Sequence, residues 1–128
     1  MLKLDILLDK LIKEAEDLSN NNPFISKLID QAFDKVGKST TKVIETQNQY
    51  LAMLRMLKAW YAREYTGLSP KAVISLIASV IYFVNPIDLI PDFIPFIGKL
   101  DDKLVLGYFI KKLNVEIQKF MTWEDSQQ

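Results

Sequence analysis

Residues 72–84 read Ala-Val-Ile-Ser-Leu-Ile-Ala-Ser-Val-Ile-Tyr-Phe-Val, a run without a single charge. Its length and composition favour a helix, and a helix that is hydrophobic all round is buried in a protein core or in lipid. Such a helix would rise only about 20 Å, whereas the hydrocarbon core of a bilayer is about 30 Å thick. The stretch therefore predicts the central helix of a bundle rather than a simple transmembrane helix.

Four amphipathic segments flank this central helix. Apolar residues recur at three- and four-residue spacing over residues 2–18, 23–37, 39–66 and 101–123. Asn22 and Ser69, each followed by a proline, have the residue type expected at a helix start, and Gly67 the type expected at a helix end. Gly107, inside the last segment, indicates the close approach of another helix. We expect an all-α fold of about five helices in a compact bundle, with residues 1–128 forming one domain and a frayed tail over 124–128.

The composition excludes several kinds of chemistry. Cysteine and histidine are both absent, so the chain offers no disulfide, thiolate nucleophile, imidazole base or Cys/His zinc site. Lysine plus arginine and aspartate plus glutamate each number 16, whereas a nucleic-acid binder usually has a basic excess. The charges of residues 1–10 interrupt any secretory signal. We therefore expect binding rather than catalysis, no nucleic-acid partner, and a cytoplasmic location, peripheral at the membrane.

A second unusual segment follows the central helix. Residues 1–71 carry 20 charged side chains, whereas residues 72–98 carry two. Prolines then recur every four or five positions, which is too dense for a continuous helix. The pattern predicts an apolar, proline-interrupted turn over residues 85–100, between the fourth and fifth helices. Its structural residues are Asn85, Pro86, Pro91, Pro95 and Gly98.

This segment also carries a family resemblance. The sequence reads Tyr82-x-x-Asn85-Pro86-Ile87-Asp88-Leu89-Ile90-Pro91-Asp92-Phe93-Ile94-Pro95-x-Ile97-Gly98-x-Leu100-Asp101-Asp102. It resembles the signature of the YkvA-like family of small bacterial helical proteins, and the resemblance covers about residues 75–106, with the DLIPD motif at its centre. The resemblance implies hydrophobic, sometimes membrane-predicted proteins of unknown function, and it assigns no catalytic residue.

Four aspartates in and beside this segment allow two interpretations. Asp88, Asp92, Asp101 and Asp102 could together bind magnesium or calcium, because carboxylate oxygens are the ligands that these hard cations prefer. Such a site would be a divalent-metal-dependent phosphate or diphosphate site, and the protein could then be an enzyme. In the structural interpretation, Asp88 closes a capping box with Asn85, Asp101 caps the last helix, and Asp102 suits the positive end of its dipole. Asp92 has no such structural assignment.

The apolar side chains of the turn also allow two interpretations. They are Leu89, Ile90, Phe93, Ile94, Phe96 and Ile97. They could fold back over the central helix, or part of the turn could stay exposed and dock on a bilayer surface or a protein partner. We favour a non-enzymatic helical module that docks this turn, with homo-oligomerisation left open. Lys111 and Lys112 are more typical of a solvated helix face than of a lipid-binding patch.

Overall fold

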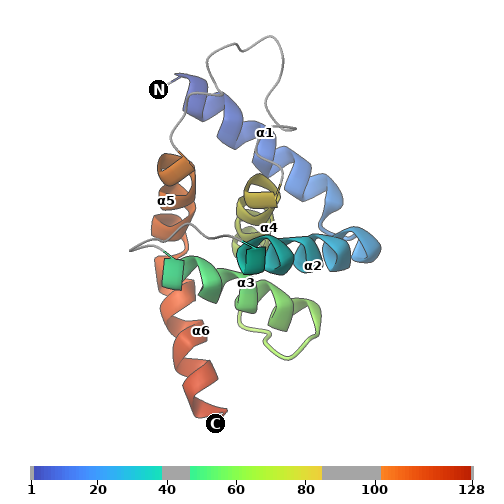
Figure 1. Cartoon of the computed structure of the whole chain (residues 1–128), viewed down its shortest axis with the longest axis vertical. Coiled ribbons are helices and arrows are strands. Elements are labelled where there is room, and N and C mark those ends of the chain that lie inside the picture. Colours follow the sequence, from blue (N-terminus) through green and yellow to red (C-terminus); the bar gives the residue numbers. More distant parts are fainter. Residues whose placement is uncertain (1, 39–46, 85–101, 128) are drawn as a thin grey trace.

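The computed structural model describes residues 2–38, 47–84 and 102–127, and these ranges contain helices and no strand. The helices are α1 (Leu2–Leu18), α2 (Asn22–Lys38), α3 (Gln47–Tyr61), α4 (Pro70–Val84), α5 (Asp102–Lys112) and α6 (Asn114–Ser126). Figure 1 shows their arrangement, with α4 in the middle of the molecule. The predicted all-α class is confirmed.

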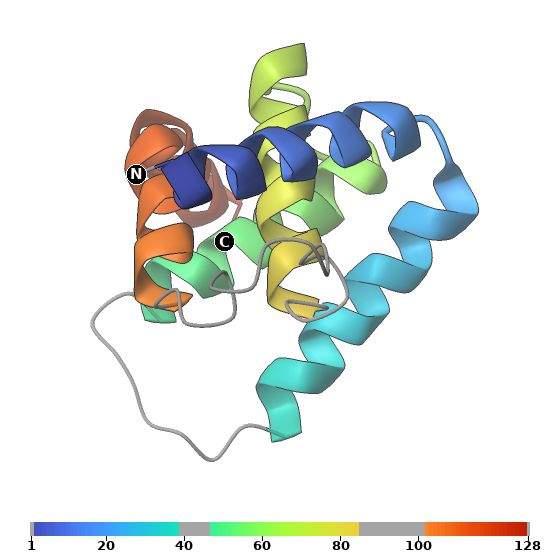
Figure 2. The same cartoon turned by 90° about the horizontal axis from the view of Figure 1, so that it is seen from above.

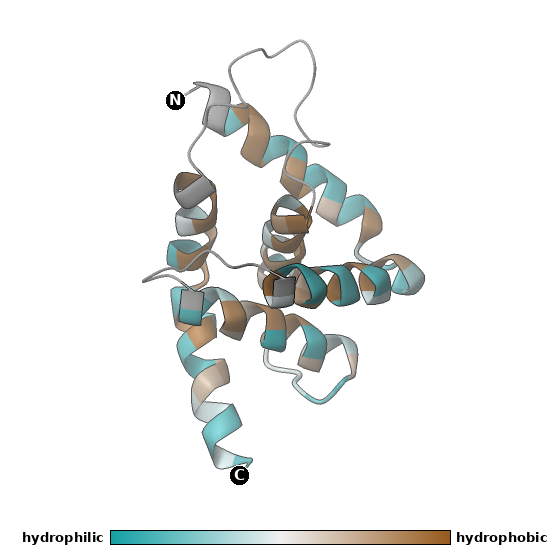
Figure 3. Ribbon diagram, viewed as in Figure 1, coloured by the Kyte–Doolittle hydropathy of each residue, from teal (hydrophilic) through white to brown (hydrophobic). Residues whose placement is uncertain are grey.

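Helix α4 is the hub of the bundle, as its all-round apolar sequence predicts. It contacts α1, α2, α3 and α5, and Figure 2 shows α1 crossing it. Leu76, Ile77 and Val80 are completely inaccessible to solvent. The buried Ser79 hydroxyl donates a hydrogen bond of 2.7 Å to the carbonyl of Leu76, which satisfies it within the helix. Figure 3 shows the contrast between the mostly hydrophobic α4 and the alternating colours of α1 and α2.

Side-chain caps begin two of the helices. The amide of Ala72 donates to Oγ of Ser69 at 3.1 Å, so the predicted cap of α4 is confirmed. In α2 the cap is Asn21 and not the predicted Asn22, because Oδ1 of Asn21 accepts the amide hydrogen of Phe24 at 3.0 Å. Asn22 and the following proline are then the first two helical residues, a part of the helix where proline is tolerated.

Helix α3 ends earlier than its sequence pattern indicates. The pattern predicts a stop at Gly67, but the helix ends at Tyr61, and its predicted beginning, residues 39–46, lies outside the described residues. Arg63 has a φ of 63°, and the amides of Arg63 and Glu64 donate to the carbonyls of Trp60 and Ala59. This hydrogen-bond pattern is a Schellman motif, with arginine at the left-handed position that glycine usually occupies.

The predicted single helix over residues 101–123 is two helices. Leu113, with φ −101° and ψ 14°, leaves helical geometry between α5 and α6, although hydrogen bonds from Leu113 to Phe109 and from Ile117 to Leu113 continue across the bend. The bend has a packing reason, because α5 contacts both α4 and α3, whereas α6 packs mainly on α3. The end of the chain, predicted to be frayed from residue 124, is helical as far as Ser126.

The prediction of a close helix contact at Gly107 is wrong. A Cβ at Gly107 would meet no atom of the described residues within 4 Å outside its own helix, so no other described helix approaches it closely. In α6, Met121 is 36% exposed, whereas Phe120 beside it is 1% exposed.

Candidate functional site

The residues that the sequence predicts as a site lie almost entirely outside the described part of the chain. This holds for Asp88, Asp92 and Asp101, for the turn residues Asn85, Pro86, Pro91, Pro95 and Gly98, and for the apolar residues Leu89, Ile90, Phe93, Ile94, Phe96 and Ile97. Asp102 is the first residue of α5, but its side chain is not described. The convergence of the aspartates and the exposure of the turn therefore stay predictions.

The structure does describe the two helix ends that this segment joins. Val84 ends α4 and Asp102 begins α5, and the two helices are in contact. Figure 2 shows the end of α4 and the beginning of α5 at the same end of the bundle, below α1 in that view. The two described helix ends that flank residues 85–101 therefore lie at one end of the bundle.

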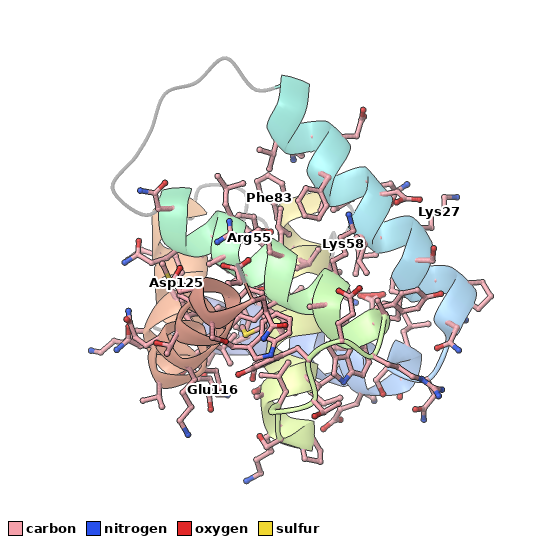
Figure 4. The ribbon with its side chains drawn as sticks, turned by 90° about the horizontal axis from the view of Figure 1, so that it is seen from below. Lys27, Arg55, Lys58, Phe83, Glu116 and Asp125 are labelled. Carbon is pink, nitrogen blue, oxygen red and sulfur yellow. The ribbon has the colours of Figure 1, made fainter. Side chains whose placement is uncertain are left out.

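The last turn of α4 is held by side chains from two other helices. Nζ of Lys35 in α2 donates a hydrogen bond of 2.7 Å to the carbonyl of Phe83 and lies 5.1 Å from the centre of its ring. The ring of Tyr50 in α3 lies 4.6 Å from that of Phe83. Figure 4 shows Phe83 between α2 and α3. Because a helix C-terminus has free carbonyls and a partial negative charge, the ammonium group of Lys35 stabilises the point where the predicted turn begins.

Tyr50 is buried with a polar atom that lacks a partner. The residue is 6% exposed, and its hydroxyl has no hydrogen-bond partner among the described residues. Burial raises the pKa of Tyr50 well above its ordinary value, so the phenol is neutral at physiological pH. It therefore contributes packing against Phe83 rather than acid–base chemistry.

We expect Tyr50→Phe to raise the free energy of unfolding by about 1–2 kcal/mol, because a buried donor without a partner loses its hydration and gains nothing in return. Urea denaturation followed by circular dichroism measures this change. Tyr61→Phe is the matched control, since Tyr61 is only partly buried and should change the stability little. A loss of stability in Tyr50→Phe would mean that its hydroxyl is hydrogen bonded.

The outer face of α5 exposes large apolar side chains beside the predicted turn. Leu104 is 55% exposed and Tyr108 is 38% exposed. Nζ of Lys112 lies 5.7 Å from the centre of the Tyr108 ring. The sequence patterns used to predict the helices did not find this face, because they followed the buried stripe of Phe109 and Ile110. The four-residue spacing of Leu104 and Tyr108 was the available signal.

Two other features of the described residues bear on site chemistry, the acidic side chains and a cavity. The acidic side chains of these residues include no group of three that could hold a metal ion. A shallow cavity of about 280 Å³ lies at the beginning of α4, at the opposite end of that helix from the predicted turn. It is lined by uncharged residues, namely Ser19, Asn20, Trp60, Leu68, Pro70, Val73 and Ile74.

Comparisons with known proteins identify the same region. Residues 72–108 match the family described as "Protein of unknown function (DUF1232)". The chain is 33% identical over 69 residues to the "Uncharacterized membrane protein YkvA" of Bacillus subtilis (strain 168), a stretch that covers 54% of this chain and 65% of that protein. No solved structure matches the chain significantly. Residues 72–108 are therefore similar to the YkvA-like family of proteins of unknown function.

Proposed function

We propose that this protein is a non-enzymatic module that attaches peripherally to a membrane surface through residues 85–101. The observation that supports the proposal best is the position of the two helix ends. The end of α4 and the beginning of α5 lie at one end of the bundle (Figure 2). The exposed Leu104 and Tyr108 lie on α5 itself, and Leu104 is in its first turn. An apolar turn at that end would extend an apolar surface that already exists on the described residues.

The burial of α4 supports a peripheral attachment rather than a spanning one. Ten residues of α4 are buried against the bundle, so its apolar surface is already covered by protein. Among the described residues, no helix is both long and apolar enough to cross a bilayer. The name of the Bacillus protein, which contains the words "membrane protein", agrees with membrane association of either kind.

The residue types of the chain also favour attachment over catalysis. With no histidine and no cysteine, the side chains available for acid–base or nucleophilic chemistry are carboxylates, lysines and hydroxyls. Two of the buried hydroxyl groups have structural roles: the Ser79 hydroxyl is hydrogen bonded within its own helix, and the neutral Tyr50 packs against Phe83.

Vesicle co-sedimentation tests the proposal. The wild-type protein is expected to pellet with vesicles of an equimolar mixture of phosphatidylcholine and phosphatidylglycerol. A Phe93→Ser, Phe96→Ser variant is expected to bind about tenfold more weakly or worse, because it loses two large apolar side chains from the proposed contact. The matched control is Ile6→Ser, Met121→Ser, which removes two exposed apolar side chains from α1 and α6.

Two results would contradict the proposal. One is a wild-type protein that stays in the supernatant with every vesicle. The other is a Phe93→Ser, Phe96→Ser variant that binds as tightly as the wild type while its circular dichroism spectrum is unchanged.

A further inference from the structure

The outer faces of α5 and α6 form one continuous surface of lysines and apolar residues. Starting from Leu104, exposed residues follow at intervals of four, three, four and four positions, which is the spacing of one helix face. Lys112 lies at the edge of this face, beside Tyr108. We call this surface the lysine–apolar stripe. Its residues are Leu104, Tyr108, Lys111, Lys112, Val115 and Lys119.

The apolar members of the stripe are too exposed to serve the core. Leu104 is 55% exposed and Val115 is 59% exposed, whereas Val105 and Phe109 on the opposite side are completely buried. The ammonium group of Lys112 lies 5.7 Å from the centre of the Tyr108 ring, so the charge and the aromatic ring act as a pair. Tyrosine and lysine side chains of this kind have an apolar body and a polar tip, which suits the boundary between water and lipid.

The charge of the stripe is of one sign. It contains three lysines and no acidic residue, although the whole chain has a net charge of zero. Glu124 in α6 pairs with Arg55 of α3 at 2.7 Å. Glu116, four positions after Lys112, lies at the edge of the stripe and close enough to Tyr65 to raise its pKa after the larger effect of burial. The residues of the stripe therefore carry a positive charge among exposed apolar side chains.

We propose that the lysine–apolar stripe lies against the membrane surface and selects anionic phospholipids. This inference rests on the proposed function, because α5 begins where residues 85–101 end and a bilayer at that end of the bundle would meet α5 next. An amphipathic helix with lysines beside its apolar face lies in the plane of the interface and binds anionic headgroups more strongly than zwitterionic ones. The stripe thus supplies lipid selectivity, and residues 85–101 supply apolar anchorage. Lys111 and Lys112, which the sequence pattern assigns to a solvated face, bind anionic headgroups in this arrangement.

Measuring affinity for vesicles of phosphatidylcholine alone and of an equimolar mixture with phosphatidylglycerol tests the inference. The test variant is Lys111→Gln, Lys112→Gln, Lys119→Gln, in which all three positions are exposed. It is expected to lose on the order of a hundredfold in affinity for the anionic vesicles, from three lysines near the surface. The control variant is Lys10→Gln, Lys13→Gln, Lys27→Gln, which removes the same charge from exposed positions on α1 and α2 and should bind as the wild type does.

The outcomes separate this inference from the proposed function. Two results would contradict lipid selection by the stripe and still agree with membrane attachment. One is equal wild-type affinity for the two vesicle types, and the other is an equal loss of affinity in the two lysine variants. Failure of the wild type to bind either vesicle would overturn both the role of the stripe and the proposed membrane attachment. An acidic protein surface would then be the partner to test.

Discussion

Leu76→Ala is expected to lower the free energy of unfolding by about 2–5 kcal/mol, the range for a large apolar side chain removed from a close-packed core. Leu76 is completely buried in the middle of α4, which contacts four other helices. The neighbouring helices cannot collapse onto the cavity without moving together, so we expect the upper half of the range. Urea denaturation followed by circular dichroism measures the change.

Ile74→Ala is the matched control for this prediction. Ile74 lies on the same helix and is also a large aliphatic residue, but it is only partly buried and faces the shallow cavity. Its replacement is expected to cost about 1 kcal/mol, in proportion to the smaller apolar area that it removes from water. Equal losses in the two variants would contradict the description of α4 as the buried hub.

The second large effect is expected at Phe120, where Phe120→Ala should cost about 3–5 kcal/mol. Its ring lies 5.1 Å from that of Tyr65 and 5.6 Å from that of Trp123, and it is 1% exposed. The substitution removes the centre of the aromatic cluster that joins α6 to the chain after α3. Thermal unfolding by calorimetry or circular dichroism measures the effect.

Glu124→Gln gives the contrast within the same helix. Its carboxylate accepts two hydrogen bonds from Arg55, at 2.7 and 3.0 Å, and these bonds raise the pKa of Arg55. The Arg55 side chain is 43% exposed, however, and ion pairs at that exposure contribute at most about 1 kcal/mol. If Glu124→Gln destabilised the protein more than Phe120→Ala, the ion pair rather than the aromatic cluster would hold α6 in place.

The sequence predicts those parts of the fold that depend on composition or on one strong local signal. The absence of charge over residues 72–84 predicts a buried helix, and the structure confirms it. Ser69 followed by proline predicts the start of α4 correctly. In residues 20–22, three consecutive asparagines offer equivalent caps, so the pattern cannot distinguish Asn21 from Asn22.

The parts that the sequence does not predict depend on tertiary packing. Arg63 adopts a left-handed conformation that its residue type does not indicate, and α3 therefore ends before Gly67. Leu113 carries no helix-breaking signal, yet the bend there lets α5 pack on α4 and α6 on α3. Gly107 indicates a packing contact by its residue type, but a side chain there would meet open space among the described residues.

The candidate site is likewise predicted from the sequence only in part. The sequence marks residues 85–102 by their prolines, apolar residues and aspartates, and the family match covers that segment. The lysine–apolar stripe was missed, because Leu104 and Val115 resemble core residues until the direction of the buried face is known. Only the position of Phe109 against the bundle shows that these two residues point outward.

The most direct test of membrane attachment uses the absence of cysteine from the chain. A single cysteine introduced as Phe96→Cys can carry an environment-sensitive fluorophore, and Lys27→Cys on the exposed surface of α2 provides the reference position. On addition of anionic vesicles, we predict a blue shift of emission and quenching by bilayer-embedded quenchers at position 96, and neither at position 27. An unchanged emission at position 96, or the same change at both positions, would contradict attachment through residues 85–101.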